Sequence, residues 1–175
     1  MRVLGVDPGS AVTGFGVVEG RPGAFRYVTA GCIRTTPVET APERLQRIHS
    51  GLLRVIDEHL PVIVSLERHF VARNPQSAFR IGEVRAMAML AAAQRSLPVR
   101  EYPPNQVKLA IAAFGHADKT QMKNVVRRTL GLGPELELAD DAADALALAI
   151  CDLSRARPLR LRDAVERPAR RETHP

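Results

Sequence analysis

The chain has 175 residues, of which 45% are hydrophobic, so a single domain with its own core is expected. No apolar run approaches the roughly 18 residues that a membrane span needs, and the N-terminus lacks the apolar stretch of a signal peptide. These features argue against a membrane protein. With only two cysteines, they predict a cytoplasmic protein without disulfide bonds.

The formal net charge of +6 favours a polyanionic partner such as a nucleic acid. Most of this charge lies in residues 155–175, which contain seven arginines and three acids, and residues 1–154 carry a net charge of only +2. We therefore expect residues 1–154 to form the folded domain and residues 155–175 to form a basic, disordered tail. The composition of the tail alone fits a DNA contact and a merely solvated end equally well.

Short apolar runs and amphipathic stretches alternate along the chain, separated by Pro, Gly and helix-capping residues. In chain order, we expect strands over residues 2–6, 12–18 and 25–33, a helix over 41–59 opened by a capping box at Thr40 and Glu43, a strand over 62–66, a helix over 75–95, a strand over 99–102, and helices that begin at Pro104, at Lys119 after a second capping box, and at Asp141. This order predicts an α/β fold with a mixed five-stranded sheet and helices packed against it.

The helix over residues 75–95 is apolar nearly all round, from Met87 to Ala93 in particular. A helix that packs only on its own sheet needs a single apolar face. We therefore expect one face of this helix to pack on the sheet and the other on a partner chain.

Four acids stand out by their positions. Asp7 ends the first strand and Glu67 ends the fourth, whereas Asp141 and Asp144 lie three residues apart on one face of the last helix. The same stripe continues through Leu148, so we expect Asp144 to lie on a buried, sheet-facing strip, where it must be paired, protonated or bound to metal.

Taken singly, each acid has an ordinary explanation as a turn residue, an exposed strand end or a helix cap. Together they form a set of oxygen ligands without His or Cys, which is typical of Mg²⁺ or Mn²⁺. Two such ions would offset the repulsion among the carboxylates and attract a phosphate group.

These residues stand in longer motifs, namely Val6 to Gly16, Ala30 to Thr35, Leu66 to Phe70, Asn74 to Gly82, and Asp141 to Leu146. With these motifs the chain resembles the RuvC family of bacterial Holliday-junction resolvases over residues 2–153. The resemblance implies an RNase H-like fold and a homodimer that nicks two strands of a four-way DNA junction, leaving 5′-phosphate and 3′-hydroxyl ends. It further implies cooperation with the branch-migration proteins RuvA and RuvB.

The resemblance also implies roles for individual residues. Two Mg²⁺ or Mn²⁺ ions per subunit would be bound by Asp7, Glu67, Asp141 and Asp144. Phe70 would stack on an unpaired base, and Lys108 and Lys119 would bind phosphates near the scissile bond. Weaker candidates for phosphate contacts, chosen because they are close to Glu67 in sequence, are Arg68, Arg73 and Arg80.

Other interpretations remain at this level. A shift of one residue would make Asp140 a ligand in place of Asp141, whereas the favoured alignment makes Asp140 a helix cap. The Asp7-Pro8-Gly9 turn is also similar to the phosphate-binding turn of actin-like ATPases and sugar kinases, although no second Asp-x-Gly follows. A junction-binding module without catalysis and a nuclease for RNA or RNA–DNA hybrids complete the alternatives.

Overall fold

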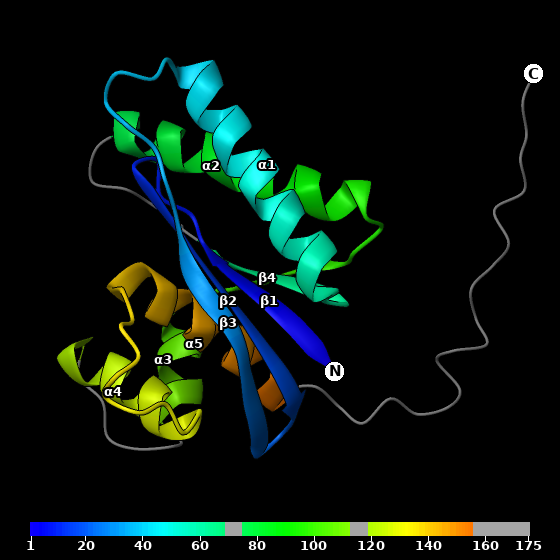
Figure 1. Ribbon diagram of the computed structural model, residues 1–175, viewed down its shortest axis with the longest axis vertical. Helices are drawn as coiled ribbons and strands as arrows, with labels where there is room; N and C mark the ends of the chain where they lie inside the picture. Colours follow the sequence, from blue (N-terminus) through cyan, green and yellow to red (C-terminus); the bar gives the residue numbers. More distant parts are fainter. Residues whose placement is uncertain (69–74, 113–118, 156–175) are drawn as a thin grey trace, which may run out of the picture.

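The computed structural model describes residues 1–68, 75–112 and 119–155. Within these ranges the elements, in chain order, are β1 (Arg2–Asp7), β2 (Val12–Arg21), β3 (Ala24–Arg34), α1 (Ala41–His59), β4 (Ile63–Glu67), α2 (Pro75–Gln94), β5 (Val99–Tyr102), α3 (Pro104–Ala112), α4 (Lys119–Thr129) and α5 (Asp140–Arg155). Figure 1 shows them as a sheet between two layers of helices.

The sheet has the strand order β3-β2-β1-β4-β5. Strands β1, β2 and β3 form an antiparallel meander, whereas β4 and β5 run parallel to β1. The predicted mixed five-stranded sheet is therefore confirmed. The central strand β1 lies between β2 and β4, so a residue at its carboxyl end has neighbours on both sides.

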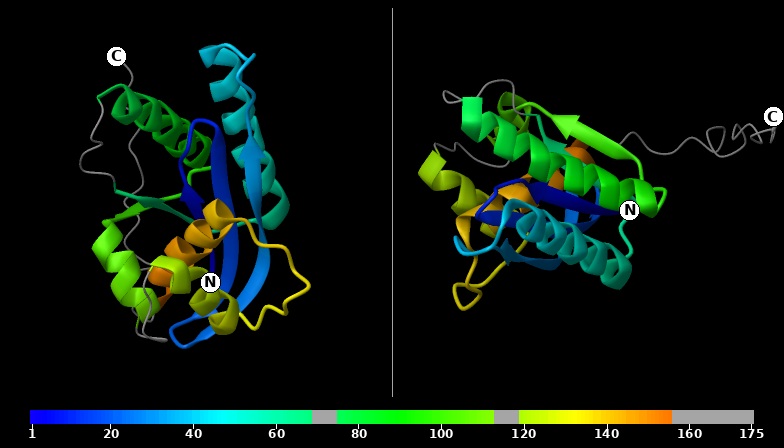
Figure 2. Two further views of the ribbon diagram at one scale, coloured as in Figure 1. Left: turned by 90° about the vertical axis from the view of Figure 1, so that its left-hand side faces the viewer. Right: turned by 90° about the horizontal axis from the view of Figure 1, so that it is seen from above.

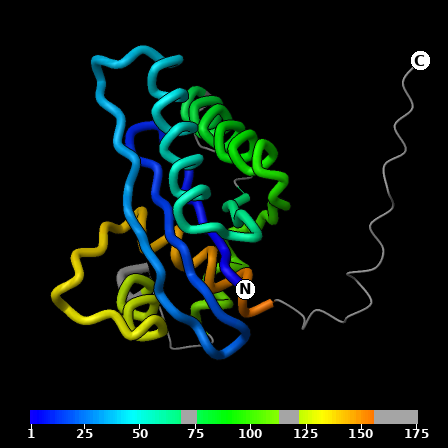
Figure 3. Tube along the Cα trace, turned by 45° about the vertical axis from the view of Figure 1, so that its right-hand side comes forward, coloured from blue at the N-terminus to red at the C-terminus, as the bar shows by residue number. Residues whose placement is uncertain are grey.

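Helices cover both faces of the sheet. Helices α1 and α2 lie side by side on one face, and α5 crosses the other face with α3 and α4 packed against it (Figures 2 and 3). Side chains of β1 alternate between the two layers: Leu4 and Val6 belong to the core beneath α1 and α2, and Val3 belongs to the core beneath α5. The two core layers hold the sheet from both sides.

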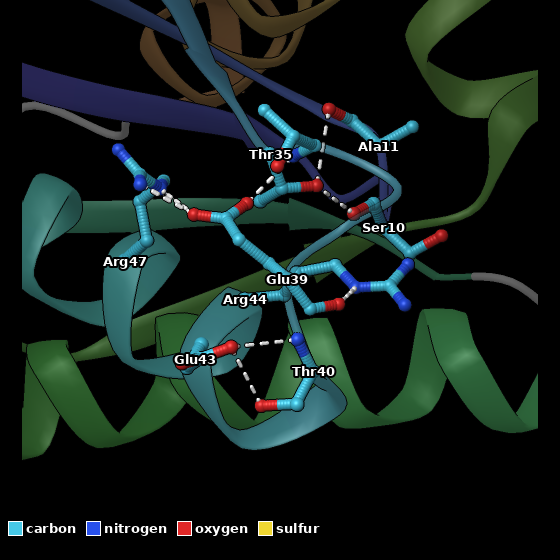
Figure 4. A network of polar contacts seen from close by, with 9 residues as sticks. Ser10, Ala11, Thr35, Glu39, Thr40, Glu43, Arg44 and Arg47 are labelled. Carbon is cyan, nitrogen blue, oxygen red and sulfur yellow. Dashed lines mark hydrogen bonds and ion pairs between the residues drawn. The ribbon is translucent and has the colours of Figure 1, made fainter.

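Polar contacts order both the turn that follows Asp7 and the start of α1 (Figure 4). The Glu43 carboxylate accepts hydrogen bonds from the backbone N–H of Thr40 at 2.7 Å and from its hydroxyl at 2.8 Å, so Thr40 and Glu43 cap the helix as predicted. The Thr35 hydroxyl donates to the carbonyl of Ser10 at 2.7 Å. Thr35, just after β3, therefore braces the β1–β2 turn.

Element boundaries differ from the sequence-based expectation in a few places. The β2–β3 hairpin extends to Arg21 and Ala24, and Gly23 turns the chain with φ 78°, a conformation that favours glycine. The second capping box at Asp118 and the tail over residues 156–175 lie outside the described residues. No helix in the described ranges combines the length and the apolar character that membrane crossing requires.

Candidate active site

Three of the four predicted acids line one cavity of about 140 Å³. We call it the carboxylate cavity, and its lining residues are Asp7, Glu67, Pro104, Val107, Lys108, Met122, Asp144 and Leu148. They come from β1, β4, α3, α4 and α5, so the cavity forms where the carboxyl end of the sheet meets the helices of one layer.

Sheet register places the first two acids next to each other. Strands β1 and β4 pair in parallel, with Val6 opposite Leu66, so Asp7 and Glu67 follow at the same level on adjacent strands. Both side chains are partly exposed rather than buried. A ligand at this edge of the sheet can therefore reach both carboxylates.

Helix α5 brings the third acid to the cavity because glycines let it lie close to the sheet. A Cβ atom added to Gly5 would lie 1.9 Å from the carbonyl oxygen of Ala145, and one added to Gly14 would lie 2.0 Å from that of Asp141. No side chain fits in these gaps. Gly5 and Gly14 therefore set the distance between the strands and the acidic end of α5.

Asp144 is exposed and opens into the cavity, so the prediction that it lies on a buried, sheet-facing strip was wrong. The residues of α5 that touch the sheet glycines are Asp141, Ala145, Leu146 and Ala149. The stripe that begins at Asp144 faces α3 instead, and its last member, Cys151, contacts the carbonyl of Gln106. Asp144 is exposed at the first turn of this stripe, where it lines the carboxylate cavity.

Asp141 and Asp140 point in different directions. The backbone and Cβ of Asp141 lie against Gly14. Burial raises the pKa of the Cys32 thiol on β3, and the charge of Asp141 raises it further, with a smaller contribution from Asp7. Asp141 therefore lies near Asp7 but does not line the carboxylate cavity.

Asp140 is the first residue of α5 rather than its N-cap, so its prediction as a cap was wrong. Its side chain is 89% exposed and its carboxylate forms an ion pair with Lys123 at 2.9 Å. The Asp140 carboxylate is therefore paired with α4, whereas Asp141 lies against Gly14 of β2, next to Asp7.

A buried polar network locks α5 to the strand that carries Glu67. Asp152 on α5 is fully buried and accepts hydrogen bonds from Ser65 at 3.0 Å, Tyr102 at 2.8 Å and Arg100 at 3.1 Å. Burial, followed by the charge of Asp152, raises the pKa of the Tyr102 hydroxyl far above its usual range, so this group stays protonated and donates to Asp152. The network fixes α5 relative to β4 and β5.

The donor atoms of the cavity fit a hard divalent cation. Its acids offer oxygen ligands, and among the residues that the structure describes neither His nor Cys lines it. In the described part of the chain, no three acidic, imidazole or thiol groups are already gathered closely enough to hold an ion. Binding would therefore require the carboxylates of Asp7, Glu67 and Asp144 to turn towards a common point within the cavity they share.

The predicted DNA-contacting residues fall into three groups. Lys108 lines the carboxylate cavity, and Lys119 is the first residue of α4, one turn before the cavity residue Met122, although its side chain lies outside the described part. Phe70 and Arg73 lie outside the described residues. Arg80 lines another cavity, of about 370 Å³.

That second cavity lies between the first turns of α1 and α2, beside the β1–β2 turn. Its polar lining includes Ser10, Arg44, Gln76 and Arg80. Sequence proximity to Glu67 therefore did not bring Arg80 to the carboxylates. Arg68 follows Glu67 directly and is exposed.

Sequence reasoning missed the residues that support the acids. The close approach of α5 could have been anticipated from the glycines at positions 5, 14 and 16, because three small residues on adjacent strands are typical of a tight helix contact. Asp152 gave one signal, an acid within a run of apolar helical residues. The partners of Asp152 come from distant strands, and no local pattern indicates them.

Comparison with known proteins gives one consistent result. The family model described as crossover junction endodeoxyribonuclease RuvC matches residues 3–152. The RuvC proteins of Pelotomaculum thermopropionicum and Halorhodospira halophila are 47% and 49% identical to the chain over 151 residues, which cover 86% of the chain and 92% and 88% of those proteins.

Solved structures agree with this result. The structure of Thermus thermophilus RuvC in complex with a Holliday junction substrate matches with a TM-score of 0.79 at 36% identity, covering 86% of the chain and 92% of that protein. The yeast mitochondrial Holliday junction resolvase matches with a TM-score of 0.60 at 11% identity, which shows a shared fold only. The RNase H-like fold predicted from the sequence is thereby confirmed.

Proposed function

The chain belongs to the RuvC family of crossover junction endodeoxyribonucleases, and from this premise we propose that it resolves four-way DNA junctions by metal-assisted hydrolysis at the carboxylate cavity. The observation that carries the proposal is the convergence of Asp7, Glu67, Asp144 and Lys108 from four separate elements on this one cavity. A phosphodiester needs this pairing of metal-binding acids with a cation that can hold the phosphate. Family membership favours this function over an ATPase or a nuclease for RNA–DNA hybrids.

Asp7, Glu67 and Asp144 would hold two divalent ions, Mg²⁺ or Mn²⁺. Such a pair, when bound, supplies a positive field that activates water and offsets charge on the leaving oxygen. Asp7 would hold metal together with Glu67, because its central strand places it between Glu67 on one neighbouring strand and Gly14, against which Asp141 lies, on the other. Asp141, near Asp7 but outside the cavity, would complete the ligand set or orient the attacking water.

Basic and aromatic residues would hold the DNA around this centre. Lys108 would bind a non-bridging oxygen of the scissile phosphate, and Lys119, at the start of α4, would act beside it. Phe70 would stack on an unpaired base, and Arg73 and Arg80 would contact flanking phosphates. Cleavage would leave 5′-phosphate and 3′-hydroxyl ends.

Helix α2 would form the centre of a homodimer interface. Its buried face, with Val84, Ala88 and Ala91, packs within its own subunit, whereas Phe79 is 77% exposed and Leu90 is 45% exposed. Exposed apolar side chains of this size on one helix support a protein–protein contact. Two subunits would then present two carboxylate cavities for symmetric nicking, in cooperation with RuvA and RuvB.

Substitution of Asp7 by Asn separates binding from catalysis. The variant keeps the shape of the side chain but loses the charge that holds metal, so it should bind a four-way junction with affinity within a few-fold of wild type and cut it undetectably. Gel-shift and cleavage assays on the same labelled junction measure both properties. Cutting at the wild-type rate by Asp7→Asn would overturn the proposal.

A further inference from the structure

Arg85 on α2 binds the ends of β4 and β5, beside the carboxylate cavity. One terminal nitrogen of its guanidinium group donates to the backbone carbonyl of Glu67 on β4, and the other donates to the Glu101 carboxylate on β5. The Arg85 side chain is only 15% exposed and forms an ion pair with Glu101. A planar guanidinium with two donors suits such a two-point contact better than any other side chain.

The carbonyl that Arg85 binds belongs to Glu67, the last residue of β4. Glu67 pairs with Tyr102 of β5, and the next backbone N–H, that of Arg68, donates to the Tyr102 carbonyl at 2.8 Å. Leu66, just before it, is fully buried. Because Arg85 binds the Glu67 carbonyl and β5 pairs with the strand on its other side, the backbone of Glu67 is held from two sides, which sets the direction of its Cα–Cβ bond at the edge of the cavity.

From this geometry we propose that Arg85 is a positioning residue of the active site, which acts on metal binding through the backbone of Glu67 without touching metal or DNA. The inference rests on the proposed function, because Glu67 matters here as a metal ligand. Arg85 holds the strand end in the orientation that lets Glu67 share an ion with Asp7 on the neighbouring strand. Without the guanidinium, the last peptide of β4 loses its anchor to α2 and the carboxylate samples orientations that do not face the cavity.

The main test measures Mn²⁺ binding to the full chain by calorimetry in the absence of DNA. Three further measurements are made on the same variants: junction affinity in EDTA, the half-saturating Mn²⁺ concentration for cutting, and thermal unfolding. Arg85→Gln should weaken Mn²⁺ binding and raise the half-saturating concentration by about 10- to 100-fold, the range typical of residues that orient metal ligands. Junction affinity in EDTA should stay within about two-fold, because Arg85 makes no DNA contact in this account. Arg85→Lys should recover part of the loss, since an ammonium group can reach one acceptor but not both in the same plane.

Arg95 supplies the matched control. It forms a two-point contact with Asp57 of α1, at 2.6 Å and 2.8 Å, just beyond the other end of α2. Arg95→Gln removes an arginine–carboxylate pair of the same kind far from the cavity and should leave Mn²⁺ affinity unchanged.

Three results would overturn the inference: an Arg85→Gln variant with wild-type Mn²⁺ affinity, an equal loss in Arg95→Gln, or an Arg85→Lys variant no better than Arg85→Gln. If Arg85→Gln does not fold, the Mn²⁺ affinities of Arg85→Lys and Glu101→Gln are measured by the same calorimetry. Wild-type Mn²⁺ affinity in both variants would overturn the inference. Failure of the proposed function looks different, because the wild-type protein itself would then neither bind Mn²⁺ at the cavity nor cut junctions.

Discussion

Replacing Gly14 by Ala should displace the acidic end of α5 and abolish most of the cutting activity. The new methyl carbon would lie 2.0 Å from the carbonyl oxygen of Asp141 and 3.0 Å from its Cβ. Ordinary van der Waals contact begins near 3.4 Å, so strand and helix must separate by about 1.4 Å at this point. A displacement of about 1 Å in a catalytic site typically costs on the order of 100-fold in rate, and overpacking costs about 1–3 kcal/mol of stability.

Single-turnover cleavage of a labelled junction at saturating enzyme measures the rate, and thermal unfolding measures the stability. Gly51→Ala is the matched control, because its methyl group would meet the Cδ1 atom of Ile33 at 2.7 Å, in the helical layer on the other face of the sheet. That variant should lose some stability and keep its cleavage rate within about two-fold, because α5 does not move. A folded Gly14→Ala protein that cuts at the wild-type rate would show that the spacing between β2 and α5 does not control catalysis, and so would an equal loss of rate in Gly51→Ala.

Four further outcomes are expected. Tyr102→Phe removes a donor from the fully buried Asp152 and should lower the free energy of unfolding by about 1–3 kcal/mol in urea titrations; an unchanged transition would contradict the role of the network. Lys108→Met should slow junction cutting by about 100-fold while binding in EDTA changes little, and a loss confined to binding would point to a different role. Ala86→Arg, on the exposed side of α2, should convert the proposed dimer to a monomer in analytical ultracentrifugation, and a monomeric wild-type protein would disprove the interface. Burial raises the pKa of the Cys151 thiol to about 11, so at pH 8 it stays protonated and should react with a thiol reagent only on unfolding; rapid labelling of native Cys32→Ser protein would contradict this.

Features that depend on neighbours in sequence were predicted well. The capping pair Thr40 and Glu43 lies within one helical turn, and the structure confirms their contact. The strands that end at Asp7 and Glu67 were visible as short apolar runs closed by an acid. Local physical chemistry decides such features, so the sequence alone is enough to predict them.

Features that depend on packing between distant elements were not predicted correctly from the sequence. The side of α5 on which Asp144 lies depends on where the helix meets the sheet and where it meets α3, and periodicity alone assigned it to the wrong strip. Arg80 is close to Glu67 along the chain, yet α2 carries it to a different cavity. Arg85 gave no signal, because the carbonyl it binds and its partner Glu101 come from two strands that pair only in the folded protein.

We propose that the chain cuts four-way junctions with metal held at the carboxylate cavity. The most direct measurement incubates the protein with a labelled mobile four-way junction, a linear duplex of the same sequence and an RNA–DNA hybrid, each with Mg²⁺, Mn²⁺ or EDTA. We expect paired nicks in strands of like polarity in the junction alone, with either metal and not with EDTA. An intact junction with both metals, or equal cutting of the duplex or the hybrid, would contradict it.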